Sequence, residues 1–313
     1  MNRFKRLMVS TISLAALSLG SAAALAQGGL AAQPGQLPAV ARAALIQEID
    51  AYRVAHPELF RVVLDVEGVR PEVYTTFRNP LPNAAPELRA LGPAALLPML
   101  SALAIEGPRR ALSDRERRAL TSGMLEAVGR LRDPRSTPVL RAALEGASKD
   151  PVVRRAAAEA LGRLCGDADL ALLIKHAAAG DELREASIHG LGQCKRVESA
   201  RHLATTLESA ADDATAVAAA GALGLVGSSW AWKAMGPAAE PTGLAVREIA
   251  ARALVKAFPL RGGEVRARIG KSMLEVEHPI LPELIEKARA SARPELQMAF
   301  ETLQKQLARR LVR

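Results

Sequence analysis

The stretch at residues 150–162, DPVVRRAAAEALG, decides the fold of this 313-residue chain. Asp150 suits the cap before a helix, and Pro151 suits its first turn. The apolar residues that follow recur at helical spacing and share one face: Val153, Ala156, Ala157, Ala160 and Leu161. The stretch therefore predicts an amphipathic helix that ends at a Leu-Gly pair.

This ending recurs at intervals of 30–33 residues, as Val128-Gly129, Leu161-Gly162, Leu191-Gly192, Leu223-Gly224 and a degenerate Leu254-Val255. A short break follows each of the first four copies, and then comes a second helix, beginning near Thr137, Ala168, Val197 and Trp230. Two helices of this length cannot bury their own apolar faces, so each pair must stack on its neighbours. We therefore predict an all-α fold, an α-solenoid of stacked helical hairpins.

The flanks differ from the repeats in their aromatic residues, which are absent between Arg78 and Ser229. Terminal units of a solenoid are atypical because they seal the stack from water. We predict an N-terminal helical cap at 39–80, a repeat array at 85–258, and a degenerate repeat with a C-terminal helical cap at 259–313. Residues 27–38 are expected to form a flexible leader.

Residues 1–26 have the pattern of a secretory signal peptide, with a basic start, an apolar stretch and the small residues of Ala24-Leu25-Ala26. Removing Arg3, Lys5 and Arg6 with it lowers the formal net charge from +9 to +6. No later stretch has about 18 uninterrupted apolar residues, so we expect no transmembrane span in the mature chain. The expected location is the periplasm or the extracellular space.

Composition excludes several classes of protein. With 49% hydrophobic residues the chain is too apolar to be disordered, and two cysteines are too few for a disulfide-dense scaffold or a four-cysteine zinc site. The moderate positive charge does not require nucleic acid, and export argues against it. There is no nucleophile elbow, P-loop or dinucleotide-binding fingerprint. We expect no catalytic residues and no cofactor.

The helix openings at Asp150 and Asp181 and the A-x-x-A-L-G closings resemble the HEAT-repeat family, in particular short bacterial HEAT-like repeats of the PBS-lyase type. The resemblance is clearest over residues 114–258. It implies an α-solenoid whose second helices line the concave face, and it implies no single activity, since such solenoids host many functions. Iron-dependent HEAT-like hydroxylases carry His-Glu pairs, and this sequence has no such dipeptide.

Three arginines, Arg154, Arg184 and Arg247, share one register of the repeat. They form either a basic ridge for an anionic ligand or a structural ladder between neighbouring repeats, with Asp150 and Asp181 as partners. Registered charge in a repeat is usually architectural, so we favour the ladder.

The second helices, which the resemblance places on the concave face, carry the candidate binding residues. These form a mildly basic strip with two tryptophans: Arg141, Lys175, His176, Arg201, His202, Trp230, Trp232 and Lys233. Trp and Arg are enriched at binding hot spots. The alternative is a solvated helix face with tryptophans in the core.

Cys165 and Cys194 end the first helices of adjacent repeats. An oxidising compartment favours a disulfide between them, but equivalent positions in stacked helices often lie about 10 Å apart, so two buried thiols remain the alternative. A metal site that adds His176 and His189 is disfavoured, because His189 and Cys194 are five residues apart on a helix and point about 140° apart. We expect no metal.

These features favour an exported, non-enzymatic scaffold that binds a protein or peptide partner through its concave face, as a monomer or as part of a complex. One alternative is a HEAT-like enzyme related to phycobilin lyases or DNA glycosylases, although the central region lacks aromatic residues to stack on a tetrapyrrole or a base. Another is a purely structural spacer in the envelope.

Overall fold

The computed structural model describes residues 28–65, 85–108, 111–146 and 148–311. The predicted signal peptide and residues 66–80 of the predicted N-terminal cap lie outside these residues. The described part of the chain is helical and contains no strand. The predicted all-α solenoid is confirmed.

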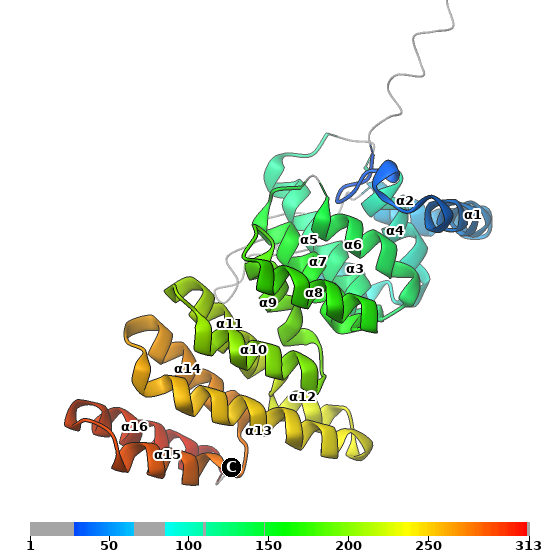
Figure 1. Cartoon of the computed structure of the whole chain (residues 1–313). Coiled ribbons are helices and arrows are strands. Elements are labelled where there is room, and N and C mark those ends of the chain that lie inside the picture. The colour runs from blue at the N-terminus through cyan, green and yellow to red at the C-terminus, as the bar shows by residue number, and fades with distance from the viewer. Residues whose placement is uncertain (1–27, 66–84, 109–110, 147, 312–313) are drawn as a thin grey trace, which may run out of the picture.

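The helices form two layers that run side by side from one end of the molecule to the other (Figure 1). The first layer contains α3 (Ala85–Ala90), α5 (Asp114–Leu131), α7 (Pro151–Leu164), α9 (Arg184–Gln193), α11 (Asp213–Val226), α14 (Gly263–Val276) and α16 (Pro294–Leu311). The second layer contains α4 (Leu96–Ala104), α6 (Thr137–Glu145), α8 (Asp167–Ala179), α10 (Val197–Ser209), α13 (Glu240–Ala257) and α15 (Leu281–Ala290). At the N-terminal end, α1 (Ala39–Ala55) and α2 (Pro57–Asp65) pack on α4.

The recurring glycines explain the close packing of the first layer. A Cβ at Gly129 would lie 2.6 Å from the Cα of Ala160, and one at Gly162 would collide with the backbone oxygen of Gly190. A Cβ at Gly192 would lie 3.0 Å from the Cα of Ala222. Glycine destabilises a helix interior by up to about 1 kcal/mol relative to alanine, but here it lets neighbouring helix backbones touch.

The fifth repeat differs from the prediction, because α13 lies in the second layer beside α10 and not in the first layer. The expected second helix near Trp230 is the short α12 (Ser229–Ala234), which ends before Gly236 at φ 88° and Pro237. The chain then enters α13, and α14 takes the place beside α11. The ring of Trp232 packs against Gly243, where a side chain would collide with it.

The predicted flexible leader is also different in the structure, as far as it is described. The backbone amides of Leu30, Ala31 and Ala32 donate hydrogen bonds of 2.9–3.0 Å to carbonyl oxygens of Ala102 and Leu103. Both alanines are buried. Small apolar side chains at these positions let the segment lie flat on the end of α4.

One described stretch, Asp213–Ala234, is long and apolar enough to cross a membrane by length and composition. It consists of α11, the following turn and α12, and most of it is buried inside the structure. Its apolar residues form the middle of the helical stack, as in the core helix of a globular protein.

Candidate functional site

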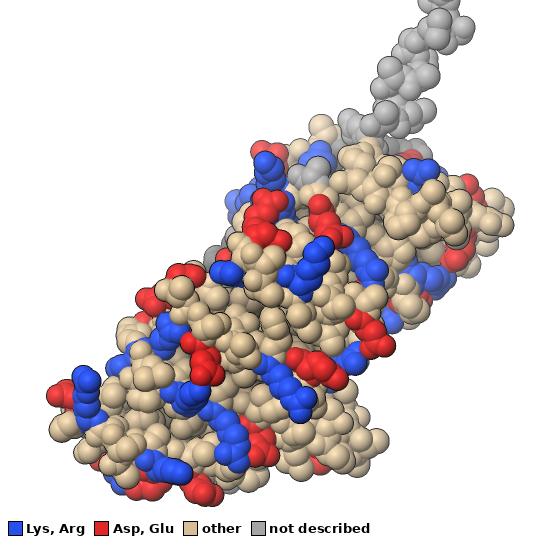
Figure 2. Space-filling view, in the orientation of Figure 1, with Lys and Arg blue, Asp and Glu red and all other residues tan. Residues whose placement is uncertain are grey.

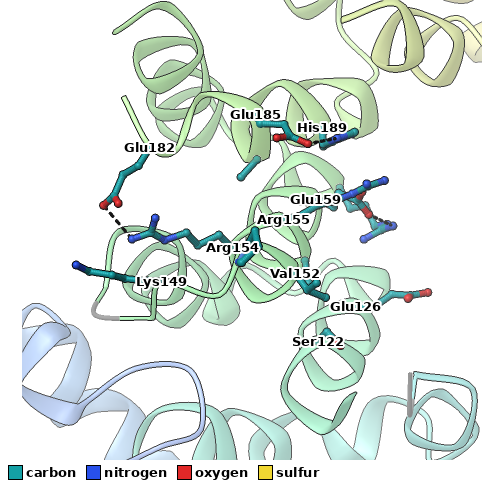
Figure 3. A pocket seen from close by; sticks show the side chains of 14 residues that line it. Ser122, Glu126, Lys149, Val152, Arg154, Arg155, Glu159, Glu182, Glu185 and His189 are labelled. Atoms are coloured by element: carbon teal, nitrogen blue, oxygen red, sulfur yellow. Dashed lines mark hydrogen bonds and ion pairs between the residues drawn. The ribbon is translucent and has the colours of Figure 1, made fainter. Parts of the chain in front are cut away.

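A hollow of about 610 Å³ opens on the first layer, across three successive helices (Figure 3). Helix α7 and the turn before it form its centre, α5 borders one side, and α9 with the turn before it borders the other. The lining residues are Ser122, Glu126, Lys149, Pro151, Val152, Arg154, Arg155, Ala156, Glu159, Arg163, Glu182, Glu185, Ala186 and His189. A cavity of this size lies within the range of about 300–1,000 Å³ that is typical of ligand sites.

The hollow exists because small residues separate long charged ones. Ser122 and Ala186 are buried and Ala156 is partly buried against the core, so the short side chains at these positions leave the floor of the hollow low. Residues one turn apart on a helix share a face, and Arg155, Glu159 and Arg163 therefore rise together from α7. Helical spacing thus builds a charged rim around a floor of small residues.

Several charges of the rim are held in ion pairs. The Arg154 side chain is almost fully buried and donates to the Ser148 carbonyl oxygen at 2.7 Å and to Glu182 Oε1 at 2.9 Å. Glu159 binds two arginines, with Arg155 Nε at 2.9 Å and an Arg163 nitrogen at 3.5 Å. The bond from Arg154 lowers the pKa of Glu182, and burial lowers the pKa of Arg163.

His189 is the one histidine of the hollow, and its side chain is only 13% exposed. Burial, followed by the positive charge of Arg155, lowers its pKa to about 4, and Glu185 at 3.7 Å opposes this only in part. The imidazole is therefore neutral at pH 7, when it has one donor and one acceptor nitrogen. The rim then carries four carboxylates and four cationic side chains.

Charge on the visible face of the molecule is mixed in the same way. Figure 2 shows basic and acidic side chains interspersed over the helices, with neither sign gathered into one large patch. A phosphate backbone is bound by clustered Lys and Arg. No such cluster lies on this face of the molecule.

The predicted ladder is present in part, with different partners. Arg118 Nε bonds Asp150 at 2.5 Å, and Arg154 bonds Glu182 where Asp181 was expected. Asp181 instead caps its own turn through the amide of Leu183 at 2.8 Å and contacts His176. The one-residue shorter opening at Asp181 moves its carboxylate away from Arg154.

Arg184 and Arg247 do not continue this ladder. The guanidinium of Arg184 lies against Gly180, and its Nε is buried without a hydrogen-bond partner among the described residues. Arg247 belongs to the second layer, where it donates to the carbonyl oxygens of Val276 and Glu277 at 3.0 and 2.7 Å. It caps the C-terminus of α14, whose last carbonyls lack helical partners.

The predicted concave strip on the second helices is not a continuous site in the structure. Arg141 is bound to the buried Asp169 at 2.7 Å, and His176 is buried between Asp181 and Glu145. Trp232 is 2% exposed and donates its Nε1–H to the Val226 carbonyl oxygen at 2.8 Å.

The rest of the strip differs from residue to residue. His202 is half-buried, and burial lowers its pKa. The remaining members are exposed, namely Lys175, Arg201, Trp230 and Lys233. The strip therefore mixes ion-paired, core and solvated side chains, and the large hollow lies on the other layer.

Cys165 and Cys194 form a disulfide, with Cα atoms 5.4 Å apart. Cys165 has a left-handed backbone conformation at the C-cap of α7, which turns it towards the end of α9. With both sulfurs in this bond, the cysteines and histidines considered as metal ligands do not come together. In the part of the chain that the structure describes, no group of three His, Cys, Asp or Glu residues is placed to hold a metal.

Sequence reasoning missed the hollow because the family resemblance directed attention to the second helices. A signal was present in Arg155, Glu159 and Arg163, which are spaced four residues apart around Ala156. Glu185 and His189 repeat this spacing on the next first helix. A charged stripe on one face of successive first helices would have marked that face as the solvent-facing surface.

Comparison with known proteins agrees with the architecture. Residues 105–192 match the family model of HEAT repeats. No curated protein matches the chain. Among the solved structures that match is human deoxyhypusine hydroxylase in complex with glycerol, with 16% identity and a TM-score of 0.30 over 85% of this chain and 98% of that one. These values are too low to carry anything from that enzyme to this chain. The family match shows HEAT repeats at residues 105–192, and the stacked helices that follow continue the same all-α architecture.

Proposed function

We propose that the chain is a non-enzymatic scaffold that binds a protein or peptide segment on the first-layer face formed by α5, α7 and α9. The observation that carries the proposal is the charged hollow, which continues over three successive repeats. A surface built from repeats is long and continuous, so it suits an extended partner. This face replaces the second helices as the proposed binding surface.

The ion pairs of the hollow support selective binding. Arg155 and Glu159 are ion-paired with each other on α7, so their charges are positioned before a partner arrives. A partner with complementary charges can exchange with these pairs, whereas a wrong pattern places like charges together. Balanced charge therefore selects for the pattern of a partner's charges more than for its net charge.

Export to the periplasm or the extracellular space is part of this proposal. It is supported by the signal-like residues 1–26 and by the disulfide, since disulfides persist in oxidising compartments. Mass spectrometry of the native protein should find a mature chain that begins at Gln27. A native chain that retains Met1 would contradict export by this route.

The binding function is tested by crosslinking the purified protein in an extract of its own compartment and identifying retained proteins by mass spectrometry. Arg155→Glu reverses a half-exposed charge inside the hollow, and Arg309→Glu makes the same change on the exposed face of α16. We expect the wild type and Arg309→Glu to retain the same partner in similar amounts. Arg155→Glu should retain about ten-fold less of it. Equal retention by all three proteins would contradict the proposal.

A further inference from the structure

A second, smaller cavity lies between α10 and α13, neighbouring helices of the second layer. Its volume is about 260 Å³. Its walls are apolar, with Leu207 and Ala257 buried and Ala204 and Ala253 partly exposed. Because three of these four residues are alanines, the two helices meet without filling the space that larger side chains would occupy.

The mouth of this cavity carries an unusual exposed leucine. Leu260 lines the cavity and is 75% exposed, whereas most leucines of the described chain are buried. The apolar wall therefore continues outwards onto the surface through Leu260. Burying such a side chain under a partner is favourable, because it removes apolar surface from water.

The charged residues at the mouth are two cations and one carboxylate. Lys256 on α13 is ion-paired with Glu208 on α10, and both side chains are more than 60% exposed. Arg261 donates to the Ala210 carbonyl oxygen at 2.8 Å and so stays beside the cavity. The lining has a net positive charge.

We propose that this cavity binds a peptide segment of a partner, which inserts one leucine- or phenylalanine-sized side chain and places an adjacent acidic residue on Lys256. The volume lies below the range of about 300–1,000 Å³ for drug-sized ligands, which favours a single anchoring side chain. The partner carboxylate takes the place of Glu208 on Lys256, and Arg261 adds a second positive charge. The inference concerns a different surface from the first-layer hollow and does not depend on it.

The test uses fluorescence anisotropy with a short fluorescein-labelled peptide that has a central Leu-Phe pair flanked by aspartates, and the same peptide flanked by lysines. We expect the aspartate peptide to bind the full-length protein and the lysine peptide to bind at least about ten-fold more weakly. Ala253→Trp fills the cavity and should weaken binding of the aspartate peptide about ten-fold or more. Ala267→Trp, on an exposed position of α14, is the matched control and should leave binding unchanged.

Two charge variants keep the test decisive if Ala253→Trp does not fold. Lys256→Gln should weaken binding of the aspartate peptide several-fold, and Glu208→Gln should strengthen it several-fold because Lys256 loses its competing partner. Each of three results would overturn the inference: no binding to the wild type, equal binding of both peptides, or weaker binding by Glu208→Gln. Loss of binding with Arg155→Glu but not with Lys256→Gln would assign the peptide to the first-layer hollow and would also overturn it.

Discussion

At His189, burial and nearby positive charge act in the same direction on one imidazole. Its pKa in the folded protein is about 4, whereas an unperturbed histidine titrates at 6.5. Arg155 on α7 and Arg268 on α14 disfavour the protonated ring, and Glu185 favours it. As the pH falls from 6.5 to 4, the unfolded chain takes up a proton that the folded chain excludes, so the free energy of unfolding decreases.

We predict that His189→Gln removes this part of the acid sensitivity. The wild type should lose about 3 kcal/mol more unfolding free energy than the variant between pH 7 and pH 4, measured by urea denaturation at each pH. Gln306→Ala, an exposed change on α16 that alters no titratable group, is the control and should keep the wild-type pH dependence. Parallel pH profiles for the wild type and His189→Gln would contradict the prediction, because they would show that His189 takes up its proton equally readily in the folded and unfolded chain.

Single residues also mark what the sequence could and could not predict. Pro151 and Asp150 were predicted to begin a helix, and Asp150 does cap α7 through the amide of Val152 at 2.9 Å. The partner of Arg154 was predicted wrongly, because a shift of one residue in the turn exchanges Asp181 for Glu182. Local signals lie within one helix, whereas a pairing across repeats depends on turn geometry that no local pattern contains.

Among the elements, α7 and α9 show how the Leu-Gly phrase determines packing. We predict that Gly162→Ala destabilises the protein by about 1–3 kcal/mol, because the new methyl group would collide with the Gly190 backbone oxygen and push the helices apart. Gly270→Ala in α14 is the control, since its methyl group would meet only the Phe258 ring at 3.6 Å. It should stabilise the helix by up to about 1 kcal/mol. Thermal unfolding of both variants tests the prediction, and stabilisation by Gly162→Ala would contradict it.

The disulfide joins the same two helices at their C-terminal ends. Cys165 and Cys194 are 29 residues apart, and closing a loop of this length stabilises a protein by about 3–4 kcal/mol through the unfolded chain. The unfolding free energy of the double variant Cys165→Ser, Cys194→Ser, measured by chemical denaturation, should be lower than that of the wild type by this amount. A reductant should lower the unfolding free energy of the wild type to that of the double variant, and it should leave the unfolding free energy of the variant unchanged. A wild-type protein that is insensitive to reductant under unfolding conditions would count against the prediction.

The whole molecule is a chain of neighbours, so damage at one end should remain local. Phe300 of α16 is fully buried and lies against Phe258, with ring centroids 4.9 Å apart. We predict that Phe300→Ala destabilises the C-terminal end by about 3–5 kcal/mol. In hydrogen exchange, α13 to α16 should lose protection while α5, α7 and α9 retain it. Uniform loss of protection along the chain would contradict nearest-neighbour stability.

At this scale the architecture was predictable and the layer assignment was not. Leu-Gly spacing alone indicated stacked hairpins, because a repeat that cannot bury its own faces has few other solutions. The same spacing predicts that the helix around Arg247 lies in the first layer. In the structure α12 has only six residues, and α13 takes the position beside α10 in the second layer. The hollow was missed for a related reason, since its location depends on which layer presents its charged face to solvent.

The covalent link between α7 and α9 has a mechanical consequence. From α3 to α16 the repeats follow one another along the stack, so tension applied across them would load the repeat interfaces in series (Figure 1). The Cys165–Cys194 disulfide would carry that force past the segment between the two cysteines. This segment could therefore not be extended, even if α7 and α9 separated. Under force the molecule would extend at its two ends, while the disulfide-linked helices α7 and α9 beside the hollow would stay together as a rigid unit.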